Sequence, residues 1–125
     1  MSYKNLEIWR LSREIVIEIH MMTLSLPKIE QFEEGQQIRR SVKSVKSNIV
    51  EGYGRRKYKQ DFIRFLVIAT ASLEETIDHL ETLYETKSFT DSGQFERLST
   101  KLLLLRKKMI SFLQAVEEKH NEYRN

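Results

Sequence analysis

Apolar side chains recur at intervals of three or four residues along almost the whole chain, which is the period of an amphipathic α-helix. Four segments carry this pattern, and we predict a helix in each. They span about residues 5–24, 33–53, 58–86 and 94–121. In the last segment, intervals of three and four alternate without a break from Phe95 to Val116, which is the spacing of a coiled-coil seam.

Residues that interrupt helices separate the four segments. Pro27 ends the first one, because the residue before a proline disfavours the α conformation. We expect Gly52 and Gly54 to end the second one, since glycine tolerates the left-handed conformation that often closes a helix. Residues 87–93 are typical of a turn followed by a helix N-cap. The chain is therefore predicted to be all-α, a single-domain, antiparallel, up-down-up-down four-helix bundle. A three-helix alternative, with the second and third segments continuous, is disfavoured by the two glycines.

Composition excludes several classes of protein. The chain has 125 residues, about one domain's worth, and no cysteine. Disulfide frameworks, thiolate metal sites and cysteine nucleophiles are thereby excluded, and a reducing compartment is indicated. No apolar run approaches the roughly 18 residues of a membrane span, and the first residues lack the features of a signal peptide. We therefore expect a cytoplasmic protein that makes no membrane contact.

Positive charge is concentrated in one part of the chain. The sequence has 21 basic and 18 acidic residues, a formal net charge of +3, yet residues 36–59 contain a single acidic residue, Glu51. Such clustering in a small domain predicts a surface for an anionic partner, nucleic acid first. The alternative is a basic helix face that is only solvated. The predicted nucleic-acid-binding residues are Arg39, Arg40, Lys43, Lys46, Arg55, Arg56, Lys57 and Lys59.

The second predicted helix has three distinct sides when it is projected at 100° per residue. One side is apolar, one is basic, and one carries small residues. The small-residue side consists of Ser41, Ser44, Asn48 and Gly52. Small side chains let another backbone approach closely, and we expect Asn48 and Glu51 to hydrogen-bond across that contact. Structural roles are therefore assigned to Asn48, Glu51, Gly52 and Gly54.

Basic residues between the second and third helices face two helix ends. They complement the negative end of the second helix dipole, but they also precede the third helix, whose free N–H groups attract anions. A bound phosphate suits both ends, and Tyr53 or Tyr58 is a candidate to stack on an unpaired base. The Gly52-x-Gly54 pair is not a dinucleotide-binding fingerprint, because no strand precedes it and the third glycine is missing.

Catalytic and metal-binding patterns are sparse. The three histidines, His20, His79 and His120, fall in different predicted helices. A di-iron bundle needs two Glu-x-x-His pairs, and only Glu117-x-x-His120 has that spacing. We therefore expect no catalytic residue, no metal site, no cofactor and no enzymatic activity.

The last predicted helix carries more apolar side chains than one seam uses. A helix that is apolar on two stripes must bury both of them, and a neighbouring subunit is the natural cover. A wide stripe facing the core is the alternative. The predicted oligomer-interface residues are Leu103, Leu104, Ile110 and Leu113.

A long string in the second and third helices has the pattern of a known family. It reads Gln37-Ile38-Arg39-Arg40-Ser41-Val42-x-Ser44-Val45-x-Ser47-Asn48-Ile49-Val50-Glu51-Gly52-x-Gly54-Arg55, followed by Phe62-x-x-Phe65-Leu66-x-Ile68-Ala69-x-x-Ser72-x-x-Glu75-Thr76. Leu6-x-x-Trp9, Leu26-Pro27 and Glu30-x-Phe32 fit the same pattern. On these residues the chain resembles the four-helix bundle family of 23S rRNA-intervening-sequence proteins over nearly its whole length.

The resemblance implies an antiparallel four-helix bundle that assembles into a homopentamer. Some members of the family are encoded within insertions in bacterial 23S rRNA genes. Others resemble the accessory protein of diversity-generating retroelements, a basic pentameric barrel that binds nucleic acid and a reverse transcriptase.

Two function hypotheses follow. The first is a non-enzymatic, homo-oligomeric protein that binds nucleic acid, RNA before DNA, through the basic residues. The second is a scaffold whose basic surface docks an acidic protein partner, such as a polymerase. An unrecognised helical-bundle enzyme is a third and weaker alternative.

Overall fold

The structure is a computed structural model that describes residues 2–125. Within this range the chain forms four long α-helices and no strand, which confirms the all-α prediction. The helices are α1 (Glu7–Thr23), α2 (Glu34–Gly54), α3 (Lys59–Glu85) and α4 (Ser92–Lys119). Three short 3₁₀ helices flank or connect them, namely η1 (Tyr3–Asn5), η2 (Lys28–Gln31) and η3 (His120–Glu122). Each α-helix begins and ends within two residues of its predicted bounds.

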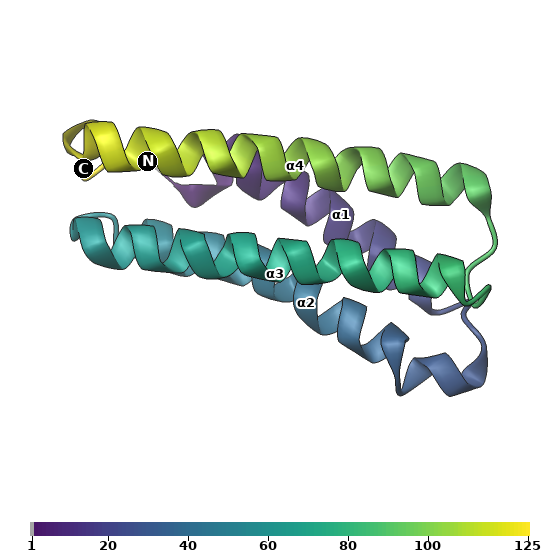
Figure 1. The fold of residues 1–125 in the computed structure, drawn as a ribbon. Coiled ribbons are helices and arrows are strands. Elements are labelled where there is room, and N and C mark those ends of the chain that lie inside the picture. The colour runs from purple at the N-terminus through teal and green to yellow at the C-terminus, as the bar shows by residue number, and fades with distance from the viewer. Residues whose placement is uncertain (1) are drawn as a thin grey trace.

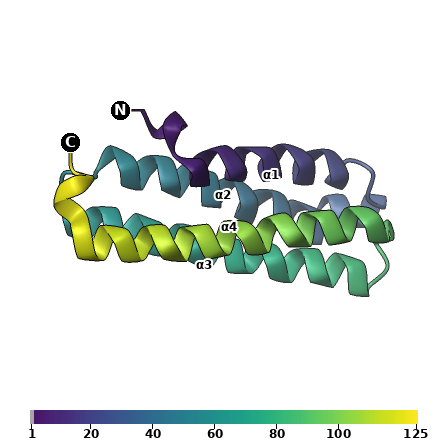
Figure 2. The same cartoon turned by 90° about the horizontal axis from the view of Figure 1, so that it is seen from above.

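Successive helices run in opposite directions, so the bundle is up-down-up-down (Figure 1). α1 and α3 each pack against both α2 and α4, and the most extensive of these contacts joins α2 to α3. Both ends of the described chain lie with the α2–α3 loop at one end of the bundle (Figures 1 and 2). Over the described residues, no helix combines the length and apolar character that crossing a membrane requires.

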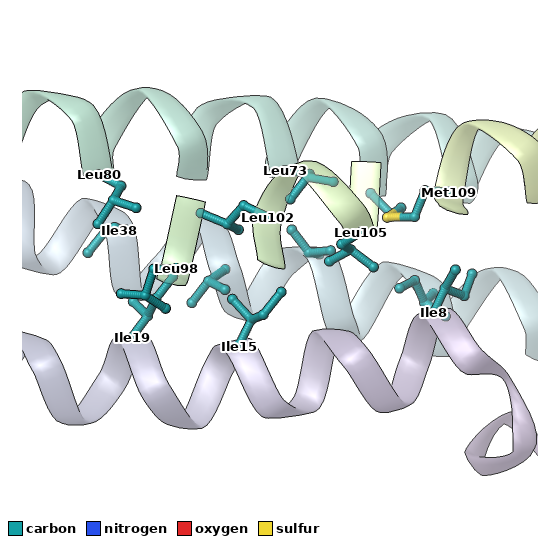
Figure 3. Close-up of a cluster of buried hydrophobic side chains, with 14 of the residues drawn as sticks. Ile8, Ile15, Ile19, Ile38, Leu73, Leu80, Leu98, Leu102, Leu105 and Met109 are labelled. Carbon is teal, nitrogen blue, oxygen red and sulfur yellow. The ribbon is translucent and has the colours of Figure 1, made fainter. Parts of the chain in front are cut away.

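The core runs along the bundle axis between the four helices (Figure 3). Its side chains come from the apolar positions that repeat every three or four residues, and each of those labelled in the figure is at most 3% exposed. They are Ile8, Ile15, Ile19, Ile38, Leu73, Leu80, Leu98, Leu102, Leu105 and Met109. Full burial of such a side chain contributes about 1.5–3 kcal/mol, so this seam is a main source of the bundle's stability.

The α2 C-terminus differs from the prediction. No glycine among residues 2–125 has a positive φ, α2 continues through Gly54, and its cap is Arg55 at φ −102°. The backbone N–H of Arg55 reaches carbonyls three and four residues earlier, so a tightened turn closes the helix instead of a left-handed glycine. Gly52 serves close packing, because a Cβ there would lie 3.1 Å from the Cβ of Phe65 on α3.

Hydroxyl groups join α2 to α3 along the predicted small-residue side. Ser44 Oγ lies 2.9 Å from Ser72 Oγ, and Thr76 Oγ1 lies 2.8 Å from Ser41 Oγ. Asn48 donates instead to its own helix, at 2.8 Å to the carbonyl oxygen of Ser44. Serine and threonine therefore make the cross-helix bonds that we expected from Asn48.

The α3–α4 connection contains a left-handed residue, a conformation that we expected instead at Gly52 or Gly54 after the second helix. Lys87, which follows the C-cap residue Thr86 of α3, has φ 65°. The backbone N–H of Lys87 donates to the carbonyl of Tyr84 at 3.1 Å, which closes the end of α3. Asp91 then caps α4, since its Oδ1 accepts from the backbone N–H of Gln94 at 3.0 Å.

Candidate nucleic-acid interface

The α2–α3 loop begins with two arginines that contact the protein itself. Arg55 pairs with Glu51 at 3.0 Å and with Asp61, in the first turn of α3, at 3.6 Å. Glu51 therefore bonds one turn along its own helix and not across the α2–α3 contact. Arg56 lies over the ring of Tyr53, 4.2 Å from its centroid, and donates to the Tyr53 carbonyl at 3.0 Å. Both arginines thus shape the loop, and Asp61 supplies negative charge at the α3 N-terminus.

Arg39 stabilises the connection between α1 and α2, at the end of the bundle opposite to the α2–α3 loop. Its Nη2 donates to the carbonyl oxygen of Gln31 at 2.6 Å, and Gln31 Nε2 donates in turn to the carbonyl oxygen of Thr23 at 2.6 Å. These bonds connect α2 to η2 and to the end of α1. The guanidinium of Arg39 is therefore committed to the α1–α2 connection.

Four of the predicted residues are both exposed and outside any salt bridge among residues 2–125. Arg40 and Lys43 lie on α2, and Lys57 and Lys59 lie in and just after the loop. None of the four forms a salt bridge with a carboxylate of residues 2–125. The two groups lie roughly 20 Å apart along α2, at 1.5 Å per residue. An anionic polymer that contacts both groups must therefore be long enough for several of its charged units to lie between them.

The two tyrosines predicted to stack on a base differ in exposure. Tyr53 is 5% exposed and packs edge to face on Phe62, with 6.3 Å between the ring centroids. Tyr58 is 62% exposed, and Lys57 Nζ lies 5.8 Å from its ring centroid. Burial therefore removes Tyr53 as a stacking surface and leaves Tyr58.

Lys46 belongs to a different surface, the groove between α1 and α2. Its Nζ lies 5.8 Å from the ring centroid of Trp9 on α1. A cavity of about 510 Å³ opens at this point. Among the residues that line it are Tyr3, Trp9, Lys43, Lys46, Ser47 and Glu51. Lys43 and Lys46 thus belong to a hollow with aromatic walls, which the sequence pattern did not predict.

Further cations lie on the other side of Trp9. A second hollow beside the same ring is lined by Lys4, Arg10, Arg13 and Glu14. Sequence reasoning misses these residues because Trp9 continues the apolar stripe of α1, which indicates a core position. The available signal is the run Trp9-Arg10-x-x-Arg13, in which basic residues follow an aromatic one at helical spacing.

The predicted interface residues of α4 do not lie together. Leu103 and Ile110 are each 46% exposed, and they share one side of the helix two turns apart. Leu104 is 44% exposed, lies about 100° away around α4, and lines a cavity of about 510 Å³ between α1 and α4. Leu113 is partly buried against the core. Leu103 and Ile110 therefore form an apolar pair on one side of α4, and Leu104 is exposed on a different side.

Two of the three histidines contact other parts of the bundle. His79 Nδ1 lies 2.6 Å from Glu34 Oε2 at the start of α2. His120 Nε2 lies 2.7 Å from the carbonyl oxygen of Arg56, so η3 contacts the α2–α3 loop. Within residues 2–125, no three histidine or carboxylate side chains gather as a metal-binding group.

Comparison with known proteins places the chain in a family. The family described as 23S rRNA-intervening sequence protein matches residues 4–111. Among solved structures, the chain resembles a protein of unknown function from the S23 ribosomal protein family of Bacteroides thetaiotaomicron VPI-5482. The TM-score is 0.77 and the identity 29%, over 86% of this chain and 95% of that one. No curated protein matches. Because the family match extends from η1 into the second half of α4, the chain belongs to the family of 23S rRNA-intervening sequence proteins.

Proposed function

We propose that this protein is a non-enzymatic, homo-oligomeric nucleic-acid-binding protein whose ligand is RNA. The proposal rests on four basic side chains, those of Arg40, Lys43, Lys57 and Lys59. They are exposed and have no acidic partner among residues 2–125. Phosphates are the polymer charges that such side chains neutralise, with release of counterions.

The predicted basic residues divide into two roles under this proposal. The exposed four, together with Lys46, contact phosphates. Arg55 and Arg56 hold the loop in shape through their contacts with Glu51, Asp61 and Tyr53. Arg39 holds η2. Phosphate contacts of this kind fix the position of a strand but read no bases, so the protein binds unrelated sequences with similar affinity.

Self-association strengthens this binding. Leu103 and Ile110 on α4 and Val67 on α3 are large apolar side chains between 46% and 48% exposed, and a second copy of the chain is their natural cover. Every added subunit repeats the basic surface, so several weak contacts sum along one strand. The family description refers to sequences that intervene in 23S rRNA, which is compatible with an RNA ligand.

Fluorescence anisotropy with labelled RNA and DNA tests the proposal. Lys57→Gln combined with Lys59→Gln is expected to weaken the binding of unrelated RNA sequences to a similar degree. The matched control is Arg97→Gln combined with Lys107→Gln, which removes two exposed charges from α4 and is expected to leave affinity unchanged.

Two outcomes oppose the proposal. Equal weakening by both double variants would mean that overall charge, and not this surface, governs binding. Absence of RNA and DNA binding at low salt would favour the alternative, a scaffold whose basic surface docks an acidic protein such as a reverse transcriptase.

A further inference from the structure

Trp9 is the single tryptophan of the chain, and its indole N–H has no partner among residues 2–125. Trp9 Nε1 is buried and is the side-chain polar atom of residues 2–125 that lacks a hydrogen bond in the interior. Buried hydrogen-bond donors almost always have an acceptor, so a buried donor without one calls for a structural or functional explanation. The ring stands edge to face against Tyr3, with 5.3 Å between centroids.

Positive charge surrounds this ring. Five basic side chains and two acidic ones line the two hollows that meet at Trp9. The basic ones are Lys4, Arg10, Arg13, Lys43 and Lys46. One of the two carboxylates, Glu51, is already paired with Arg55. The excess of cations favours a ligand that carries negative charge beside a flat ring.

The volume of the hollow and the polar side chains that line it restrict the kind of ligand further. The part of the site between α1 and α2 has a volume of about 510 Å³, within the roughly 300–1,000 Å³ of small-molecule sites. Ser47 lines it with a hydroxyl, and Glu51 offers the carboxylate oxygen Oε2, since Arg55 bonds only Oε1. These groups suit the hydroxyl and amino groups of a nucleoside, since a hydroxyl both donates and accepts and a carboxylate accepts.

We infer that the hollow around Trp9 binds one unpaired nucleotide of a single strand, with its base against the indole and its phosphates at Lys43 and Lys46. This inference rests on the proposed function and names the place where a base, and not only the backbone, meets the protein. Lys46 Nζ now lies over the Trp9 ring. Its flexible side chain leaves the ring to the base and pairs with the phosphate.

Trp9 fluorescence reports on this site directly, because the chain has no other tryptophan. The probes are a short oligouridylate and an abasic strand with the same number of phosphates. We expect oligouridylate to quench Trp9 emission and to bind at least about fivefold more tightly than the abasic strand, as one stacked base requires. The abasic strand binds through phosphates alone and leaves the emission unchanged.

Ser47→Leu tests the location without touching Trp9. Ser47 is exposed and lines the hollow, so leucine there fills the space while all charges stay in place. We expect this variant to lose both the quenching and the preference for oligouridylate, and to keep the affinity for the abasic strand. Ser111→Leu is the matched control, because Ser111 is exposed and lines the similarly sized cavity between α1 and α4. Circular dichroism checks that both variants are folded.

Each opposing result has a separate meaning. Equal affinity for the two strands with unchanged Trp9 emission overturns the nucleotide site and leaves the proposed function standing. Loss of base preference in Tyr58→Leu, but not in Ser47→Leu, moves the stacking surface to the α2–α3 loop and also overturns it. A change of Trp9 emission with protein concentration alone overturns it in favour of a second copy of the chain in the hollow. Absence of binding by either strand overturns the proposed function itself.

Discussion

Thr76 Oγ1 on α3 lies 2.8 Å from Ser41 Oγ on α2, and both side chains are buried in the contact between the two helices. Ser41 donates in turn to the carbonyl oxygen of Ile38 at 3.2 Å. A buried polar pair is stable only when its partners are aligned, so this bond fixes the rotation of α2 about its axis. The same rotation places Lys43 and Lys46 in the groove beside α1 and turns Arg40 to solvent.

A double-mutant cycle measures the coupling between these two hydroxyls. Ser41→Ala and Thr76→Val are each expected to lower the free energy of unfolding by about 0.5–1.5 kcal/mol, because each removes the bond between the two hydroxyls while the remaining hydroxyl keeps a backbone carbonyl as acceptor. Their combination is expected to cost clearly less than the sum, since both single variants remove the same bond. Urea denaturation followed by circular dichroism supplies the free energies. Strict additivity would mean that the bond contributes nothing to stability.

Lys87 offers a stabilising substitution. Its φ of 65° is a left-handed conformation that costs a residue with a Cβ roughly 1–2 kcal/mol relative to glycine. Lys87→Gly is therefore expected to raise the melting temperature. Lys107→Gly, in the middle of α4, is the control and is expected to lower stability by about 1 kcal/mol, because glycine disfavours a helix interior. A loss of stability in Lys87→Gly would contradict this account of the α3 terminus.

Gly35 is expected to be irreplaceable by alanine even though it lies in a helix. A Cβ at this position would overlap the backbone carbonyl oxygen of Glu30 in η2, which cannot move aside as a flexible side chain can. Gly35→Ala should therefore destabilise the protein by about 1–3 kcal/mol. Gly54→Ala is the control, because nothing lies within 4 Å of its added Cβ, and it should be neutral or stabilise by about 0.5–1 kcal/mol. Thermal melts of both variants decide the matter, and equal effects would refute the prediction.

Light scattering tests the proposed self-association. The pure protein is expected to form a discrete multiple of the 14.9 kDa chain, five copies being the number that the family resemblance implies. Leu103→Lys or Ile110→Lys should dissociate the assembly and preserve helicity, because both side chains are about half exposed in the single chain. Thr100→Lys, also exposed on α4, is the matched control. A monomer that persists in the wild type at tens of micromolar would contradict the proposal.

The sequence predicts the fold well because the core positions of a helical bundle repeat every three or four residues and can be recognised locally. Ile38 and Leu98, for example, are each fully buried, as their spacing indicates. Helix ends are harder to predict, since they depend on which residue meets the required backbone angles. The left-handed residue is Lys87, whereas Gly52 is needed for close packing against Phe65. Local sequence does not tell whether a glycine is needed for a left-handed backbone or for close packing.

The candidate site is less predictable, because the availability of a charge depends on tertiary neighbours. Arg55 and Lys57 look equivalent in the sequence, and both are exposed, but Asp61 pairs with Arg55, whereas Lys57 forms no salt bridge among residues 2–125. Trp9, in contrast, is a residue that the sequence did not predict to belong to the site. Its position on the apolar stripe of α1 indicates core, and only the packing of α1 against α2 reveals a hollow lined by Lys46 beside its ring.

The salt dependence of RNA binding tests the central claim most directly. Anisotropy titrations at about 50 to 300 mM salt are expected to give a linear fall of log affinity with log salt, with a slope of roughly 0.7 for each single-strand phosphate neutralised. The fourfold variant Arg40→Gln, Lys43→Gln, Lys57→Gln and Lys59→Gln should bind more weakly and flatten that slope by roughly 0.7 for each phosphate that it no longer neutralises. A variant with the slope and affinity of the wild type would contradict the claim that these four side chains bind nucleic acid.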